Sequence, residues 1–476
     1  MNEMTIKKAT IINAMGKYSQ VIANIIFTVI LARILTPEEY GVVAVITVFT
    51  NLFSVLSDAG LGTAIIQNKN LSSEDTNSIF AFSIYFAVLL ACIFAVLAYP
   101  ISIVFHNPVY IKLCLILILS ILFNTLNMVP NGLLLKEKKF KSVAFRTISV
   151  TLLTGIVTVV LALLGFKYYA LVIQSVLSSL AIFLWNFKSS DIKITLKLNR
   201  LSLEKIRHFS IFQFLFSFIN YISRNLDNLL IGIFMGSSNL AYYDKGYKLM
   251  CYPLNYLTNV ITPVLHPILS DYKNDSNYIY TKYQKVVKLL SLLGIFISLF
   301  CYFNSKEIIM IMFGKQWSAS IPCFKYLSLS IWTQMLMSST GSIYQSLDKT
   351  KLMFKSGLIT AMVTVTCIFI GLYKNDITFV SLMILIAFSI NFIITFYLII
   401  KKCFKLSLLM FAKSFIPDVM IAIILIISFN VSTNVVIISN GFFSVLVIGV
   451  INGCVYLFAL SITKELHVFS DLFKKN

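Results

Sequence analysis

Two short stretches of the chain place charged residues among apolar ones at the spacing of a helix face. Residues 223–232, SRNLDNLLIG, carry Arg224 and Asp227, and residues 241–253, AYYDKGYKLMCYP, carry Lys245 and Lys248. Residues three apart on a helix share a face, so each pair projects to one side. Asp227 would orient Arg224, but one carboxylate does not balance a guanidinium and two ammonium groups. We expect this excess of positive charge to bind an anion.

The surrounding sequence is that of a polytopic membrane protein. Of its 476 residues, 58% are hydrophobic and only 12% are charged, which is more apolar surface than a soluble domain could bury. The formal net charge is +20, but Lys and Arg stand in short runs between apolar segments. This arrangement orients a membrane protein and forms no basic domain, so we exclude nucleic acid as a partner.

Fourteen segments are long and apolar enough to cross the ~30 Å hydrocarbon core of a bilayer as helices. The loops on one side hold 24 Lys and Arg residues and those on the other hold 4, which predicts that both termini are cytoplasmic. The expected fold is therefore an all-α polytopic membrane protein with about 14 transmembrane helices. The predicted spans are 10–34, 41–64, 77–99, 109–134, 143–165, 168–187, 208–235, 239–269, 284–304, 321–346, 352–373, 376–400, 408–429 and 435–461.

The chain also has the pattern of an internal duplication. Around Leu35 and Thr36 a span ends, a short outer turn follows and a long span begins, and Gly236 and Ser237 repeat this pattern 201 residues later. The offset equals six spans, so both copies would keep one orientation, as in parallel repeats. We predict three parts: an N-terminal six-helix bundle (1–205), a second bundle (206–405), and two additional transmembrane helices with a cytoplasmic tail (406–476).

Charges inside spans are costly, at about 2.5–3.5 kcal/mol each, so they usually face water or one another. The first half contains Lys17, Arg33 and Asp58, and Lys17 could pair with Asp58 across the first two spans. For the second half, an architectural interpretation stays open, in which an internal ion-pair cluster only locks the seventh span to the eighth. Charged residues near span ends, such as Lys288, are expected to reach the interface.

The eighth predicted span contains Pro253, Pro263 and Pro267, and proline interrupts the hydrogen-bond ladder of a helix. A bent helix beside a water-filled cavity would give the freed carbonyl groups partners. His266, next to Pro267, is expected to be a satisfied polar group near the membrane interface.

Sequence patterns of enzymes are missing. No GxxxxGK[ST], HExxH or GxSxG occurs, which excludes P-loop ATP hydrolysis and indicates no catalytic residues, no metal site and no cofactor. The only carboxylate pair of the short outer loops, Glu38 and Glu39 in TPEEY, is explained by a turn. The eight cysteines stand singly, mostly in apolar segments, so they predict small buried hydrophobes.

The stretches LARILTPEEYG…SDAGLGTAIIQ and LDNLLIGIFMG…AYYDKGYKLMCYPLNYL…PVLHPILSD resemble a known family. Over the first twelve spans the chain is similar to the polysaccharide-transporter branch, the Wzx-type flippases, of the multidrug/oligosaccharidyl-lipid/polysaccharide (MOP) exporter superfamily. The resemblance implies two six-helix bundles around a central cavity plus two C-terminal helices. It also implies a multi-pass protein of the bacterial inner membrane that works by alternating access.

By the same resemblance, the cargo is an undecaprenyl-diphosphate-linked oligosaccharide repeat unit used for capsule, O-antigen or another exopolysaccharide. Membrane lipid, a polymerase and other polysaccharide assembly proteins would be further partners. Tyrosines beside the lysines would stack on sugar rings or anchor the helix at the interface. The segment YYDKGYK departs from relatives that have small residues after the tyrosines. The expected cavity-facing residues are Arg224, Asp227, Lys245, Lys248, Lys17, Arg33 and Asp58, and the expected sugar contacts are Tyr242, Tyr243 and Tyr247.

Three other functions stay open at this point. A cation-coupled drug or small-molecule antiporter of the same superfamily would need net acidic residues in its cavity, whereas this chain has an excess of cations. An integral membrane glycosyltransferase or polymerase would need larger outer loops for its chemistry. A scaffold without transport would use its buried charges for packing alone.

Overall fold

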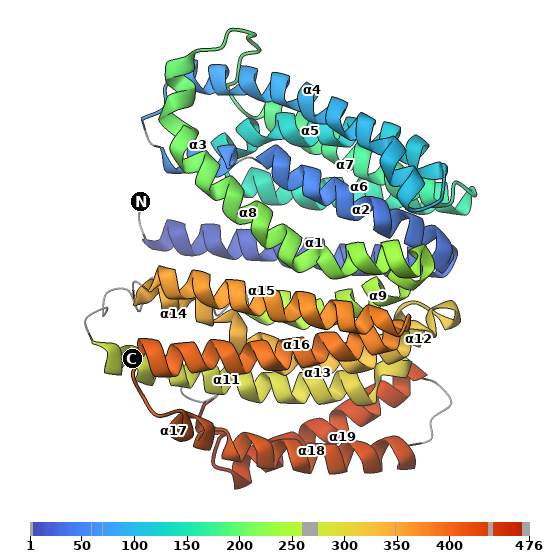
Figure 1. Cartoon of the computed structure of the whole chain (residues 1–476), viewed down its shortest axis with the longest axis vertical. Helices are drawn as coiled ribbons and strands as arrows, with labels where there is room; N and C mark the ends of the chain where they lie inside the picture. The colour runs from blue at the N-terminus through green and yellow to red at the C-terminus, as the bar shows by residue number, and fades with distance from the viewer. Residues whose placement is uncertain are drawn as a thin grey trace. The chain divides into compact units, whose positions relative to one another are not determined.

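The computed structural model describes residues 3–58, 60–68, 70–258, 275–347, 349–436 and 441–468, and these residues form helices, turns and loops without a strand. The helices gather into two compact units, Met1–Ala241 and Tyr242–Asn476, each a set of long helices that lie side by side (Figure 1). The fold class is therefore all-α, as predicted. The boundary between the units falls inside one helix, α9.

In the first unit, α5 is the central helix and packs against α2, α3, α4 and α7, while α1 packs against α6. Leucine, isoleucine and phenylalanine side chains of α3, α4, α5 and α8 form one buried cluster of this unit. The helices are α1 (Glu3–Ile34), α2 (Pro37–Asp58), α3 (Leu61–Gln67), α4 (Ser73–Val104), α5 (Val109–Lys136), α6 (Phe140–Leu163), α7 (Tyr168–Lys188) and α8 (Arg200–Met235).

Polar residues at the helix starts explain several of these boundaries. Thr36 and Glu39 bond each other's backbone N–H groups at the start of α2, at 2.9 and 3.2 Å. The side chains of Ser72 and Asp75 form the same reciprocal cap on α4. The carboxylate of Glu39 in TPEEY thus caps a helix, which agrees with its interpretation as a turn residue.

A close approach between α2 and α9 depends on one glycine of the first unit. A Cβ atom added to Gly41 would lie 2.2 Å from the carbonyl oxygen of Ser237, the first residue of α9. No other residue type fits there without moving a backbone. The start of α9 is thereby held against the N-terminal end of α2.

The second unit begins within α9 (Ser237–Pro253), which continues as a π-helical turn, η1 (Leu254–Thr258). Beyond it the helices are α11 (Ser276–Phe303), α12 (Ser305–Met312), η2 (Lys315–Trp317), α13 (Ser320–Ser338), α14 (Thr340–Ser346), α15 (Thr350–Tyr373), α16 (Ile377–Tyr397), η3 (Leu398–Cys403), α17 (Leu408–Lys413), α18 (Ile416–Val435) and α19 (Gly441–Ile462).

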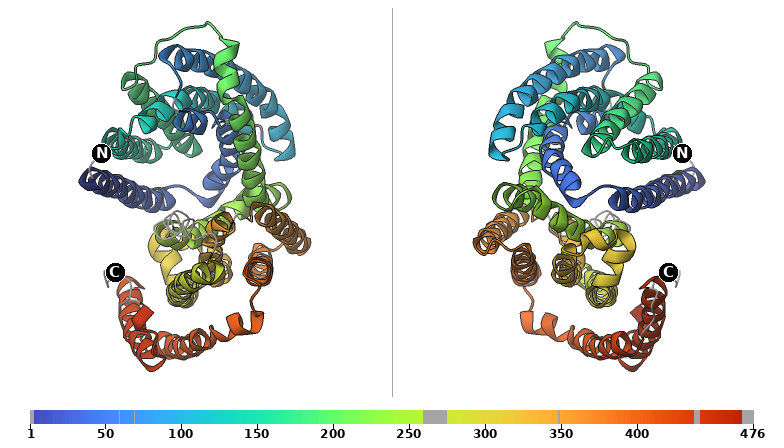
Figure 2. Two further views of the ribbon diagram at one scale, coloured as in Figure 1. Left: turned by 90° about the vertical axis from the view of Figure 1, so that its left-hand side faces the viewer. Right: turned by 90° about the vertical axis from the view of Figure 1, so that its right-hand side faces the viewer.

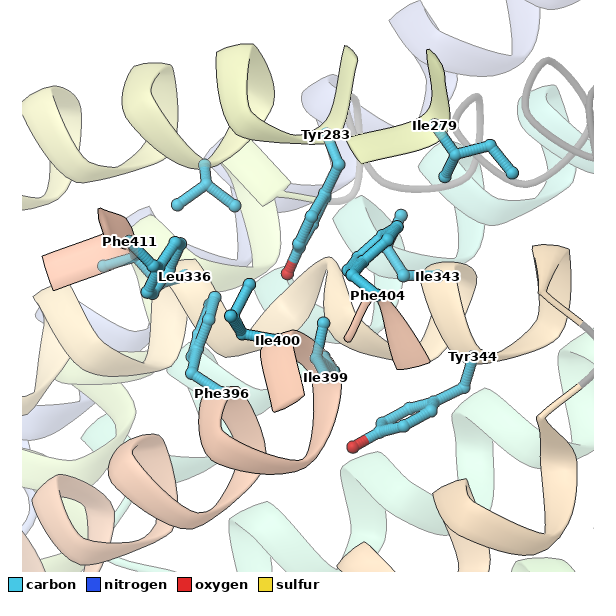
Figure 3. Packing of buried hydrophobic residues seen from close by; sticks show 11 residues of the cluster. Ile279, Tyr283, Leu336, Ile343, Tyr344, Phe396, Ile399, Ile400, Phe404 and Phe411 are labelled. Atoms are coloured by element: carbon cyan, nitrogen blue, oxygen red, sulfur yellow. The ribbon is translucent and has the colours of Figure 1, made fainter. Parts of the chain in front are cut away.

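Two apolar clusters hold the second unit together. The first joins α11, α13, α14, α16, η3 and α17 and includes Tyr283, Phe396 and Phe404 (Figure 3). The second joins α11 to α18 and α19 through residues such as Leu292, Leu425 and Tyr456. The last two helices lie at one edge of the unit, and the short α17 leads to them (Figure 2).

Each of the fourteen predicted spans coincides with helix in the described residues, and ten helices are long and apolar enough to cross a membrane by length and composition. Two spans are interrupted, one at Gly60, whose φ is 69°, and one at Ser339 between α13 and α14. The thirteenth predicted span is also divided, into α17 and α18; its helix continues to Val435, and the helix of the fourteenth begins at Gly441.

The bend predicted for the eighth span is seen at Pro253, where α9 gives way to the π-helical turn. Pro263, Pro267 and His266 lie outside the described residues. The predicted domain limits at 205 and 405 concern a sequence repeat and stay a prediction. The compact units are defined by contacts between helices. Because α8 packs against α2, α3 and α4, it belongs to the first unit, which ends at Ala241 and not at residue 205.

Candidate functional site

Lys245 is the most deeply buried of the predicted cationic residues that the structure describes. It lies on α9 with 2% of its surface exposed, and its Nζ is 5.0 Å from the ring centroid of Phe313 and 5.0 Å from that of Trp317. Ring faces carry partial negative charge and attract an ammonium group. They stabilise the charge of Lys245.

The sequence around Lys245 explains how it reaches these rings. Gly246 packs directly on α13, where a Cβ would lie 3.1 Å from the backbone nitrogen of Phe324. Gly314, with φ of 95°, turns the chain from Phe313 into η2 and so places Trp317 in the core. A glycine on each element therefore positions the lysine and the two rings.

Lys248 is held differently, one turn further along α9. Its Nζ lies 2.6 Å from Oδ2 of Asp244, with the lysine side chain 53% and the carboxylate 15% exposed. Sequence analysis set Asp227 alone against the three cations Arg224, Lys245 and Lys248. Within α9 itself, the two lysines stand beside one carboxylate, Asp244, so the excess of positive charge on this helix is smaller than expected.

The predicted sugar-contacting tyrosines differ in exposure. Tyr243 is fully buried, and its ring centroid is 5.8 Å from that of Tyr247. Tyr242 meets the ring of Trp317 edge-on at 6.0 Å. Tyr242 and Tyr247 are half-buried, which leaves part of each ring accessible. The described contacts thus give Tyr243 a packing role and leave Tyr242 and Tyr247 as candidates for sugar stacking.

The other predicted residues belong to the first unit. On α8, Arg224 is exposed and Asp227 is buried, with Oδ1 of Asp227 accepting a hydrogen bond from the backbone nitrogen of Asn228 at 2.8 Å. Arg33 is exposed in the last turn of α1, and the side chain of Lys17 lies outside the described part of that helix. The assembly of Arg224 with Lys245 and Lys248 around one anion stays a prediction.

Asp58 lines a polar cavity of about 190 Å³ within the first unit. Asparagine and serine side chains dominate the walls, which come from α2, α3 and α5. This setting can hold water or a small cation, because carboxylate and amide oxygens are the ligands that hard cations prefer. The lining residues are Ser54, Ser57, Asp58, Gly62, Asn124, Asn127, Met128 and Asn131.

Arg146 is a charged residue inside the fifth predicted span that was not among the expected cavity-facing residues, and its guanidinium lies beside this cavity. It is 7% exposed and donates from Nη1 to Oδ1 of Asn131 at 3.2 Å and to Oδ1 of Asn186. Asn186 in turn donates to Oδ1 of Asn127 at 2.7 Å. The asparagines at 124, 127 and 131 share one face of α5, a pattern that could have revealed the network.

A second missed cluster lies between α11, α18 and the end of α19. The ammonium of Lys288 bonds to the buried carboxylate of Asp418 and lies 2.8 Å from Oε1 of Glu465. Asp418 also accepts a hydrogen bond from Ser291, and Trp332 donates to Ser291 at 2.9 Å. Lys288 is thus paired with two carboxylates inside the unit, and the expectation that it reaches the membrane interface stays a prediction.

Comparison with known proteins identifies the family of this chain and solved structures with the same fold. A family described as "Polysaccharide biosynthesis protein" matches residues 30–322. The chain is 23% identical to an uncharacterized membrane protein in the cps region of Klebsiella pneumoniae, over 98% of this chain and 97% of that protein. It is also 23% identical to the lipopolysaccharide biosynthesis protein WzxC of Escherichia coli strain K12, over 78% and 76%.

Solved structures show the same fold. The lipid II flippase MurJ in an inward closed conformation superposes with a TM-score of 0.75 at 16% identity, over 98% of this chain and all of that one. An inward-facing multidrug resistance transporter of the MATE family, from the MOP superfamily, superposes with a TM-score of 0.64 at 15% identity, over 79% and 93%.

Proposed function

Because the chain belongs to the polysaccharide biosynthesis protein family, with more than half of its length matched, we propose that it moves an undecaprenyl-diphosphate-linked oligosaccharide repeat unit across the membrane. The family match and the relatives make it a multi-pass polysaccharide transporter of the MOP superfamily, rather than an enzyme. The unit passes from the cytoplasmic to the outer leaflet by alternating access, and serves capsule, O-antigen or exopolysaccharide assembly.

The observation that carries this proposal is the buried ammonium of Lys245. A diphosphate head and a glycan cannot cross about 30 Å of hydrocarbon without a polar route. Burying a lysine against Phe313 and Trp317 costs free energy that packing alone does not require, since an apolar side chain would fill the same space. A site for the anionic head of a lipid-linked glycan explains why the charge is kept.

The remaining predicted residues complete the route. Arg224 and Lys248 are exposed and can contact the phosphates, with Asp244 paired to Lys248 and Asp227 proposed to orient Arg224. Tyr242 and Tyr247 offer half-buried rings to the sugars. The prenyl tail stays in the lipid. In this proposal both termini are cytoplasmic, the protein resides in the bacterial inner membrane, and a polymerase receives the cargo outside.

The polar cavity at Asp58 favours a second candidate, a cation-coupled antiporter of the same superfamily. Its carboxylate and amide oxygens suit a proton or a small cation more than a phosphate. The two functions separate by experiment, because an antiporter without a glycan cargo would confer drug resistance and leave surface polysaccharide unchanged when the gene is deleted.

The test is surface glycan in a deletion strain that carries plasmid-borne variants. We expect Arg224→Ala, and Lys245→Ala combined with Lys248→Ala, to abolish surface glycan while immunoblots show a normal amount of protein in the membrane. Lys401→Ala with Lys402→Ala removes the same charge from exposed positions and serves as the matched control. Normal glycan export by the Lys245/Lys248 double variant would refute the anion route.

A further inference from the structure

A cavity of about 690 Å³ lies within the second unit, away from Lys245 and its rings. Its walls are the first half of α11, the junction between α17 and α18, and the segment that follows α19. Lys282 and Lys285 line it from successive turns of α11, and Lys413, the last residue of α17, lines it from the other wall. None of these lysines belongs to the transport route proposed above.

The charges of this cavity are unevenly distributed. At its inner end Lys288 is matched by Asp418 and Glu465. Lys282, Lys285 and Lys413 line the rest of it, so among the residues that the structure describes here there are four lysines and two carboxylates. Lys282 also lies 5.4 Å from the ring of Tyr278, a contact that leaves its charge in place. The region therefore suits a ligand with one or two negative charges.

The apolar surroundings indicate that this ligand is a lipid. Val286, Leu289, Phe415 and Pro417 line the cavity beside the lysines. Leaving it along α17 and α18, a ligand would meet large apolar side chains that are more than half exposed: Leu409, Met410, Ile416, Val419 and Ile423. A lipid matches both features, because its anionic head group suits the lysines and its acyl chains suit the apolar side chains of α17 and α18. A free ion would use only the lysines.

We propose that this cavity binds the phosphate head group of an anionic membrane phospholipid, whose acyl chains lie against α17 and α18. The phosphate bridges Lys413 to Lys282 and Lys285, and so fastens the last two helices to α11 beside the Lys288 cluster. The site is independent of the transported glycan. Its placement in the inner leaflet follows the predicted orientation, in which these lysines are cytoplasmic.

The test measures lipid binding and not transport, so its outcome is separate from the glycan-export experiment. The full chain is purified in neutral detergent, and its thermal unfolding midpoint is recorded with added phosphatidylglycerol, phosphatidylcholine or inorganic phosphate. We expect phosphatidylglycerol alone to raise the midpoint. Replacing the three lysines together (Lys282→Gln, Lys285→Gln, Lys413→Gln) should weaken apparent affinity on the order of a hundredfold, at about a fivefold step per lysine.

Removing three exposed lysines from elsewhere in the same unit gives the control: Lys351→Gln, Lys401→Gln and Lys402→Gln. The control should keep the lipid-induced shift. If the triple variant keeps it equally, or if inorganic phosphate or a prenyl diphosphate reproduces it where phosphatidylglycerol fails, the proposal is overturned. Native mass spectrometry of the single variant Lys413→Gln, counting bound phosphatidylglycerol, decides the matter if the triple variant does not fold.

Discussion

Lys245 and Lys288 are both largely enclosed in the second unit, yet the protein surrounds them in different ways. Lys288 touches two carboxylates, Asp418 and Glu465, from helices that follow it by more than 100 residues. Lys245 touches the faces of Phe313 and Trp317. A carboxylate carries a full charge opposite to that of a lysine, whereas the face of an aromatic ring attracts the ammonium through partial charge.

This difference suggests a division of labour within one unit. The Lys288 cluster joins α11 to α18 and to the end of α19, next to the apolar cluster that packs the same helices. Asp418 and Glu465 pair with Lys288 and so hold these helices together. Lys245 lies on α9, beside the exposed Lys248 and the half-buried Asp244 and Tyr247. Stability should thus depend on Lys288 and transport on Lys245.

The largest effect is expected for Asp418→Ala. Lys288 would keep Glu465 alone, and Ser291 would lose its acceptor, in a region that is almost closed to water. Removing one partner of a buried ion pair costs about 3–5 kcal/mol, so the thermal unfolding midpoint should fall sharply. Lys288→Met combined with Asp418→Leu should recover most of the loss. Equal midpoints for Asp418→Ala and the parent chain would contradict the structural role of this cluster.

A smaller change in stability is expected for Lys245→Met, together with loss of export. Methionine fills a similar volume and packs on the same rings, so the free energy of unfolding should change by less than about 2 kcal/mol. The charge is gone, so surface glycan should disappear. Thermal unfolding and the glycan assay on one preparation check both parts. A variant that exports normally but unfolds early would reverse the assigned roles of Lys245 and Lys288.

The sequence predicts the helices well because a bilayer demands long apolar runs, and each run is a local signal. It also selects Lys245, since a charge inside such a run is visible without a structure. The partners of these charges were not predictable in the same way. Asp418 lies 130 residues beyond Lys288, and no periodicity links them. Phe313 and Trp317 have no sequence signal that links them to Lys245. They meet it because Gly246 lets α9 pack on α13 and Gly314 turns the chain into η2.

Interruptions within spans were missed for a related reason. Residues 37–66 are apolar enough to be taken as one span although the helix stops and restarts at Gly60, and the polar residues around Ser339 do not by themselves fix where α13 ends. By contrast, the hydrogen-bond network of asparagine side chains around Arg146 could have been predicted from the sequence. Asparagines 124, 127 and 131 repeat at helical spacing in an apolar span, and three polar side chains on one face predict a shared partner. Selecting charged residues alone excluded them.

The smallest effect is expected for Asp244→Asn, which tests the ion pair that Lys248 forms within its own helix. The pair of Asp244 with Lys248 lies within one helix, and half of the lysine side chain is exposed. Pairs of this kind contribute at most about 1 kcal/mol, so the unfolding midpoint should barely move. Because Lys248 would then be less restrained, export should fall only partly, and Lys248→Gln should reduce it further. A loss of stability as large as that of Asp418→Ala would mean that Asp244 is part of the fold's core, and Lys248 would then lose its place in the proposed anion route.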